Sequence, residues 1–260
     1  MPFATAPDGA RLFYDVAGSG PPVVLVHGGL WDRRLWDDQW EAFTTRFRTI
    51  RPDFRGFGRS DPAEREFNLT EDLLTVLDAE GVLRAAVVGL SLGGYAAIDL
   101  ALTHPDRIST LVLVGAGVTG FDDWGEDIRR HRKETEAAVQ RGDLGAALEL
   151  DLELWCPLRT GSDDRQRLIA RENLNAPLAE DLADVFEQRA IDRLGEISVP
   201  TLVLVGDRDI PEMLRLADLL ATGIPGARKA VIEEADHVPN VRKPEVFNGL
   251  VIGFLEEVAA

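Results

Sequence analysis

The chain has 260 residues, of which 45% are hydrophobic and 28% charged, a composition that is typical of globular proteins and excludes a disordered chain. Asp and Glu number 45 against 28 Lys and Arg, so the formal net charge is −17. This charge repels the phosphates of nucleic acids and anionic lipid headgroups, and we expect neither as a partner. The length suits one large α/β domain with a modest insertion.

The N-terminal residues, MPFATAPDGA, lack the basic start and the apolar run of a secretory signal. The uncharged stretch 85–98 is shorter than a membrane span requires. The single cysteine, Cys156, cannot form an internal disulfide, and the histidines and cysteine show no metal-ligand spacing. We therefore expect a cytoplasmic protein that uses no metal and no other cofactor.

Short apolar runs alternate with helical stretches along most of the chain. Asp8-Gly9 predicts a hairpin turn, which an alternating strand at 11–16 follows. Runs typical of strands buried on both faces occur at 23–26, 48–52, 85–88, 110–114, 201–205 and 230–232. Helices are predicted at 71–80, 93–103, 213–221 and 244–258. This alternation predicts a mostly parallel sheet with helices on both faces.

One segment interrupts the alternation. Between 119 and 196 the sequence has no strand-like run. It has instead four charged, amphipathic stretches, at 127–139, 144–154, 164–172 and 177–189. We interpret 119–196 as a helical insertion over the sheet, and residues 1–118 and 197–260 as the core.

The strongest chemical signal is Gly89-Leu90-Ser91-Leu92-Gly93, which matches G-x-S-x-G between a buried strand and a helix of small residues. A sharp strand-to-helix turn holds the serine in a strained conformation, in which side chains at positions 89 and 93 would collide. The hydroxyl of Ser91 is then exposed as a nucleophile, and the helix N-terminus stabilises negative charge that develops beside it.

A serine nucleophile needs a base that an acid orients. His237 follows the run 230–232, so we expect it in a loop at the end of a strand. Asp207 and Asp209 both follow the run 201–205, and neither charge nor periodicity separates them. Asp209 reaches farther past the strand end, whereas Asp207 is better placed to hydrogen-bond its own turn.

The loop that begins at His27 supplies another part of the predicted site. An oxyanion hole needs two backbone N–H groups, and those of Gly29 and Leu92 are the candidates. We expect His27 to fix this loop by hydrogen bonds and not to transfer protons. The residues predicted to bind substrate are Leu30, Trp31, Trp124 and Trp155.

The chain resembles the α/β-hydrolase superfamily, in particular its small capped members such as 3-oxoadipate enol-lactonases, carboxylesterases, meta-cleavage C–C hydrolases and cofactor-free haloperoxidases. The resembling stretches are VVLVHGG at 23–29, RPDFRGFGRSDP at 51–62, VVGLSLGGYAA at 87–97, PTLVLVGDRD at 200–209 and EADHVPNVRKPEVFNGLVIGFL at 234–255.

The resemblance implies an α/β-hydrolase fold with a helical cap at 119–196 that closes the active site. It also implies a triad of Ser91, Asp209 and His237, since the family's Gly-x-x-Asp pattern places its acid on Asp209. One departure is Asp236, because the family often has glycine before the catalytic histidine; here the position adds a charge beside the base.

These residues predict a serine hydrolase that cleaves a small carboxylic ester or lactone through an acyl-enzyme. The same triad also suits C–C bond hydrolysis of dienoic ketoacids and perhydrolysis of the haloperoxidase type. A non-enzymatic ligand receptor on this fold is a third hypothesis. Haloalkane dehalogenases and epoxide hydrolases are disfavoured, because they use a carboxylate where this chain has Ser91. The sequence leaves the oligomeric state open.

Overall fold

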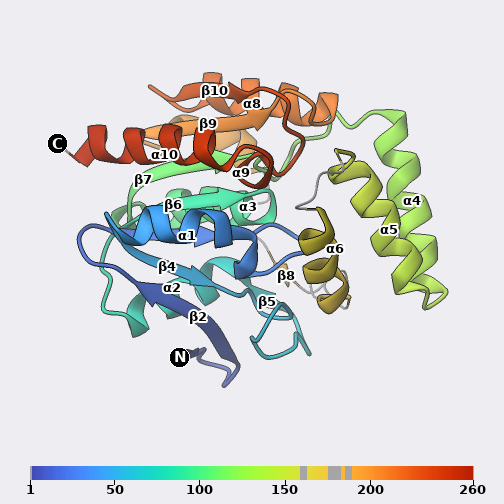
Figure 1. Cartoon of the computed structure of the whole chain (residues 1–260), viewed down its shortest axis with the longest axis horizontal. Helices are drawn as coiled ribbons and strands as arrows, with labels where there is room; N and C mark the ends of the chain where they lie inside the picture. Colours follow the sequence, from blue (N-terminus) through green and yellow to red (C-terminus); the bar gives the residue numbers. More distant parts are fainter. Residues whose placement is uncertain (1, 159–162, 175–182, 185–188, 260) are drawn as a thin grey trace.

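The computed structural model describes residues 2–158, 163–174, 183–184 and 189–259, which form a sheet of eight strands with helices on both faces (Figure 1). The strands lie in the order β1-β2-β4-β3-β6-β7-β9-β10. Their bounds are β1 Phe3–Thr5, β2 Arg11–Ala17, β3 Pro22–Val26, β4 Arg48–Pro52, β6 Ala85–Leu90, β7 Ile108–Val114, β9 Thr201–Gly206 and β10 Arg228–Ile232. β2 pairs antiparallel with β1 and β4, and all other neighbours are parallel. The predicted fold class is therefore observed.

The central strands β6 and β9 are buried at every residue because helices cover both faces of the sheet. Helices α2, α3 and α8 cover one face, and α1 and α10 cover the other. The bounds are α1 Asp37–Thr44, α2 Leu69–Ala79, α3 Leu92–Thr103, α8 Pro211–Gly223, α9 Pro239–Arg242 and α10 Pro244–Ala259. Among the described residues, no helix has both the length and the apolar character needed to cross a membrane.

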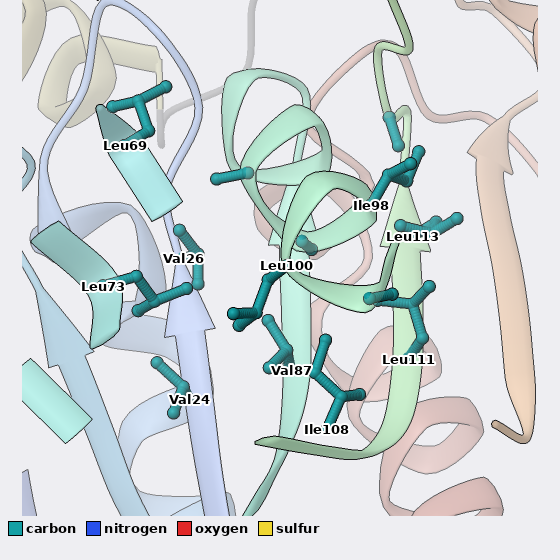
Figure 2. Packing of buried hydrophobic residues seen from close by; sticks show 14 of the residues in the cluster. Val24, Val26, Leu69, Leu73, Val87, Ile98, Leu100, Ile108, Leu111 and Leu113 are labelled. Atoms are coloured by element: carbon teal, nitrogen blue, oxygen red, sulfur yellow. The ribbon is translucent and has the colours of Figure 1, made fainter. Parts of the chain in front are cut away.

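Figure 2 shows the packing on the face covered by α2 and α3. Ile98 and Leu100 of α3 lie over β6 and β7, and Leu69 and Leu73 of α2 lie beside β3; all four side chains are at most 1% exposed. Because successive side chains of a strand alternate between faces, β3 contributes to both cores at once. This double burial fixes the position of its last residue, Val26, where the predicted oxyanion loop begins.

The N-terminal hairpin forms at Asp8-Gly9 as predicted, but the expected alternation in β2 is incomplete. Phe13 is as buried as its neighbours, although it lies on the face opposite to theirs. The guanidinium groups of Arg33 and Arg59 lie over its ring, 4.4 and 4.1 Å from the centroid. Cation–π contacts therefore cover a face that the sequence pattern assigns to solvent.

The segment 119–196 contains helices α4 Glu126–Gln140, α5 Leu144–Trp155 and α6 Asp163–Glu172, at the predicted stretches. In Figure 1, α4 and α5 stand apart from the sheet, with α6 between them and the core. The expectation that this segment has no strand is wrong. β8 Ala183–Asp184 pairs in parallel with β5 Phe67–Asn68, and two residues are too few to give an apolar run. The rest of the stretch 177–189, apart from its last residue, lies outside the described residues.

Candidate active site

Ser91 lies at the turn between β6 and α3, with φ 50° and ψ −108°, a conformation that residues with a side chain rarely adopt. A Cβ atom at Gly89 would lie 2.3 Å from the carbonyl oxygen of Gly93, and one at Gly93 would lie 2.4 Å from that of Val26. Side chains at positions 89 and 93 would therefore collide with the backbone, as expected from the sequence. Only glycine at both positions lets α3 begin directly against the end of β3.

His237 and Asp209 form a buried pair, with side chains 2% and 1% exposed. His237 Nδ1–H donates a hydrogen bond to Asp209 Oδ2 at 2.8 Å, and the N–H of Ile210 donates to Oδ1 at 2.8 Å. The neutral ring therefore has its lone pair on Nε2. This atom is buried and has no hydrogen-bond partner among the described residues, so it is available to accept a proton.

Asp207, the other candidate acid, is exposed and accepts a hydrogen bond from the N–H of Ala235 at 3.1 Å. The expectation that it would bond its own turn is therefore wrong, because its partner lies in the loop after β10. β9 and β10 end side by side, so the first carboxylate beyond β9 reaches the neighbouring loop. Asp209 is the aspartate of this pair that contacts His237.

Gly115, the first residue after β7, makes room for the His237 ring. A Cβ atom there would lie 3.2 Å from both Nδ1 and Cε1 of His237, and the residue has φ +45°. This glycine was not among the residues expected in the site. The available signal was its place directly after the buried run 110–114, because the other site residues also follow the carboxyl ends of predicted strands.

His27 holds the loop after β3 by two hydrogen bonds. Its Nδ1–H donates to the carbonyl oxygen of Gly28 at 2.8 Å, and its Nε2 accepts from the N–H of Phe54 at 3.0 Å. The rings of Phe54 and Phe57 contact the buried imidazole. Burial lowers the pKa of His27 to about 4, so the ring is neutral near pH 7. Its position and bonding agree with the structural role expected from the sequence.

A cavity of about 450 Å³ lies at the Ser91 turn, and His237 lines it too. All the predicted oxyanion and substrate-binding residues line this cavity: Gly29, Leu30, Trp31, Leu92, Trp124 and Trp155. As the first residue of α3, Leu92 has an N–H with no partner inside the helix. Trp155 packs its ring on that of His237, with centroids 4.5 Å apart and planes inclined by 40°.

The cavity also has lining residues that the sequence analysis missed. The apolar ones include Tyr95, Ile128, Leu154 and Met213, and the polar ones are His131, Arg132, Thr135, Glu136 and Asp151. These five polar residues lie on α4 and α5, whose charged residues have the pattern of a helix face exposed to solvent. In the part of the chain that the structure describes, no group of three or more His, Cys, Asp and Glu residues is arranged to hold a metal ion.

The mostly parallel sheet and the strained serine turn define an α/β protein of the hydrolase class. Residues 21–244 match the family described as the alpha/beta hydrolase fold, and the chain belongs to this family.

Three known proteins extend this finding. A protein of Azorhizobium caulinodans, provisionally named a carbamate hydrolase, is 30% identical, and the alignment covers 99% of each chain. 3-oxoadipate enol-lactonase 1 of Acinetobacter baylyi is 27% identical over 92% of this chain and 90% of its own. A solved thermophilic esterase of Thermogutta terrifontis is 29% identical, covers 100% of this chain and 99% of its own, and has a TM-score of 0.83. The protein is a hydrolase, and the resemblance to enol-lactonases and esterases is confirmed.

We expect His27 to make folding less favourable as the pH falls. An ordinary histidine titrates near 6.5 and this one near 4, so between these values the unfolded chain binds a proton that the folded protein does not. The contribution of neutral His27 to the free energy of unfolding is fully present above pH 6.5 and decreases by about 2 kcal/mol between pH 7 and pH 5. Urea unfolding at both pH values should show a smaller decrease for His27→Gln than for the wild type. Equal decreases in the two proteins would contradict the prediction.

Proposed function

We propose that the protein is a serine hydrolase that cleaves a small carboxylic ester or lactone through an acyl-enzyme. One observation carries the proposal: a single cavity is lined by the strained Ser91 and by His237, whose Nδ1 is bonded to Asp209 while its Nε2 has no partner among the described residues. Ser91 is the nucleophile, His237 the general base, and Asp209 the acid that orients the base.

In this mechanism Ser91 Oγ attacks the substrate carbonyl carbon and its proton passes to His237 Nε2. Asp209 stabilises the resulting imidazolium, and the N–H groups of Gly29 and Leu92 bind the oxyanion. The imidazolium returns its proton to the leaving alkoxide, which in a lactone remains attached to the acyl group. Water then gives a proton to Nε2 and attacks the acyl-enzyme, which releases the carboxylic acid and restores Ser91.

The names of the three relatives support acyl transfer at a carbonyl bonded to a heteroatom, since they refer to a carbamate, an enol-lactone and an ester. We also propose that 119–196 is a cap and that 1–118 and 197–260 form the core. The lining supports this division, because Ile128 and Leu154 of the segment face the same cavity as Ser91 and His237 of the core.

The polar lining supports a substrate whose acyl group carries a carboxylate. Asp151 accepts a hydrogen bond from His131 Nε2–H at 2.8 Å, so these two groups satisfy each other. Arg132 lies over the Trp124 ring, 4.4 Å from the centroid, and no carboxylate pairs with it among the described residues. In a protein with a net charge of −17, a lining guanidinium that forms no ion pair within the described part of the chain is a ready partner for an anionic substrate.

Ser91→Ala should abolish turnover and leave the fold intact. The substitution removes the nucleophile, and the expected loss in kcat is about 10³-fold or more. Hydrolysis of p-nitrophenyl esters measures the loss, thermal unfolding checks the fold, and an organophosphonate should label Ser91 in the wild type. Full activity in the alanine variant would remove the mechanism.

Asp209→Asn should lower kcat by about 10⁴-fold, because an amide at this position mis-sets the tautomer of His237. Asp207→Asn is the matched control, since its oxygen still accepts the bond from Ala235 and it does not contact the imidazole. We expect this control to keep most of its turnover in the same assay. An inactive Asp207→Asn beside an active Asp209→Asn would reverse the assignment.

Arg132→Gln should raise KM for the mono-p-nitrophenyl ester of adipic acid by about tenfold, as expected for one lost charge-assisted hydrogen bond. KM for p-nitrophenyl hexanoate, which has an acyl chain of the same length without the carboxylate, should change little. Arg130→Gln controls for charge on α4, because Arg130 pairs with Asp127 and does not line the cavity. Equal effects of the two variants on both esters would argue against carboxylate binding by Arg132.

A further inference from the structure

Asp236, the residue before His237, is fully buried and joins two parts of the chain. Arg242 of α9 donates from Nε to Oδ1 and from Nη2 to Oδ2, both at 2.9 Å, and the two side chains are 1% and 0% exposed. Oδ2 also accepts a hydrogen bond from the N–H of Leu158 at 3.1 Å. Leu158 follows the end of α5, so this carboxylate ties the loop after β10 to the segment that leaves α5.

A second contact joins the same two segments. Trp155, the last residue of α5, packs on the His237 ring at 4.5 Å between centroids. From the core, Asp209 bonds to Nδ1 and Gly115 lies against the same edge of the ring. The imidazole is thus held between groups at the ends of β7 and β9 and one aromatic ring from α5.

Stability alone does not account for the Asp236–Arg242 pair. The desolvation of two buried charges offsets most of their attraction, and apolar residues of similar volume are often as stable. What a bidentate pair does supply is one defined geometry.

We propose that Asp236 is a positioning residue, which seats the segment after α5 against the His237 loop so that Trp155 holds the imidazole with Nε2 facing the cavity. The proposal rests on the proposed role of His237 as the base. Without this attachment the ring samples orientations in which Nε2 does not reach the serine hydroxyl. Proton transfer then slows, while the rest of the cavity binds substrate as before.

The test is Asp236→Asn, which keeps the size but removes the charge and one of the two acceptor oxygens, so that Leu158 N–H and the Arg242 guanidinium compete for the oxygen that remains. We expect kcat to fall about tenfold or more, since small misplacements of a catalytic group have large effects, while KM stays within about twofold. Turnover is calculated per active site titrated with an organophosphonate, so that unfolded protein does not count. If Asp236→Asn does not fold, Asp236→Asn/Arg242→Gln, which leaves no buried guanidinium without an acid and still lacks the bidentate pair, is measured with the same expectation.

Two further variants separate positioning from general stabilisation. Asp207→Asn changes an acid that bonds the same loop at Ala235 without touching the segment after α5, and it should keep the wild-type kcat. Trp155→Leu should also lower kcat. In the double variant Trp155→Leu/Asp236→Asn, the fold-loss of kcat should be smaller than the product of the two single losses, because both substitutions remove the same constraint on the His237 ring.

Wild-type kcat per titrated site in the Asp236 variants would overturn the proposal, as would a rise in KM without a fall in kcat. An equal loss of kcat in Asp207→Asn would also overturn it. So would a double variant of Trp155 and Asp236 whose loss of kcat equals the product of the two single losses. A wild-type protein that neither hydrolyses esters nor reacts with the phosphonate at Ser91 would instead overturn the proposed function, and this proposal with it.

Discussion

The contact between the first turn of α3 and the end of β3 is the constraint on which the site depends. There is no space for a Cβ atom between Gly93 and the carbonyl groups of Val26 and His27. This close approach forces the sharp turn after β6 and puts Ser91 in its strained conformation. It also brings the N-terminus of α3 beside the start of the loop that contains Gly29, so that one backbone contact places the Ser91 turn and this loop next to each other.

The other site residues follow from the strand order. β3, β6, β7, β9 and β10 are consecutive in the sheet and mutually parallel, so their carboxyl ends share one edge. The loop that contains Gly29, the serine turn, Gly115, Asp209 and the His237 loop follow these five strand ends in turn. The site is therefore fixed by hydrogen-bonded register across the sheet, and its precision does not depend on any one loop being rigid.

Much of this could be predicted from the sequence, because buried parallel strands and the G-x-S-x-G turn have local signatures. The choice between Asp207 and Asp209 could not be made from periodicity, since it depends on how β9 and β10 end beside each other. The burial of Phe13 under two arginines comes from residues distant in sequence. Arg132 was overlooked because a charged position on an amphipathic helix gives the same pattern whether it faces water or a cavity. Tertiary placement, and not local preference, decided each of these cases.

The place at which the segment 119–196 joins the core has a consequence for how such a protein can diverge. The chain leaves the sheet after β7 and returns at β9, and these two strands are direct neighbours with Leu111 opposite Thr201. Their pairing is independent of the length of what lies between them. The cavity-lining residues of α4 and α5 can therefore change without disturbing the strand ends beside which Ser91, Asp209 and His237 lie. The exception is the short stretch from Trp155 to Leu158, where a change must remain compatible with the His237 ring that Trp155 contacts and with the Asp236 carboxylate that Leu158 bonds.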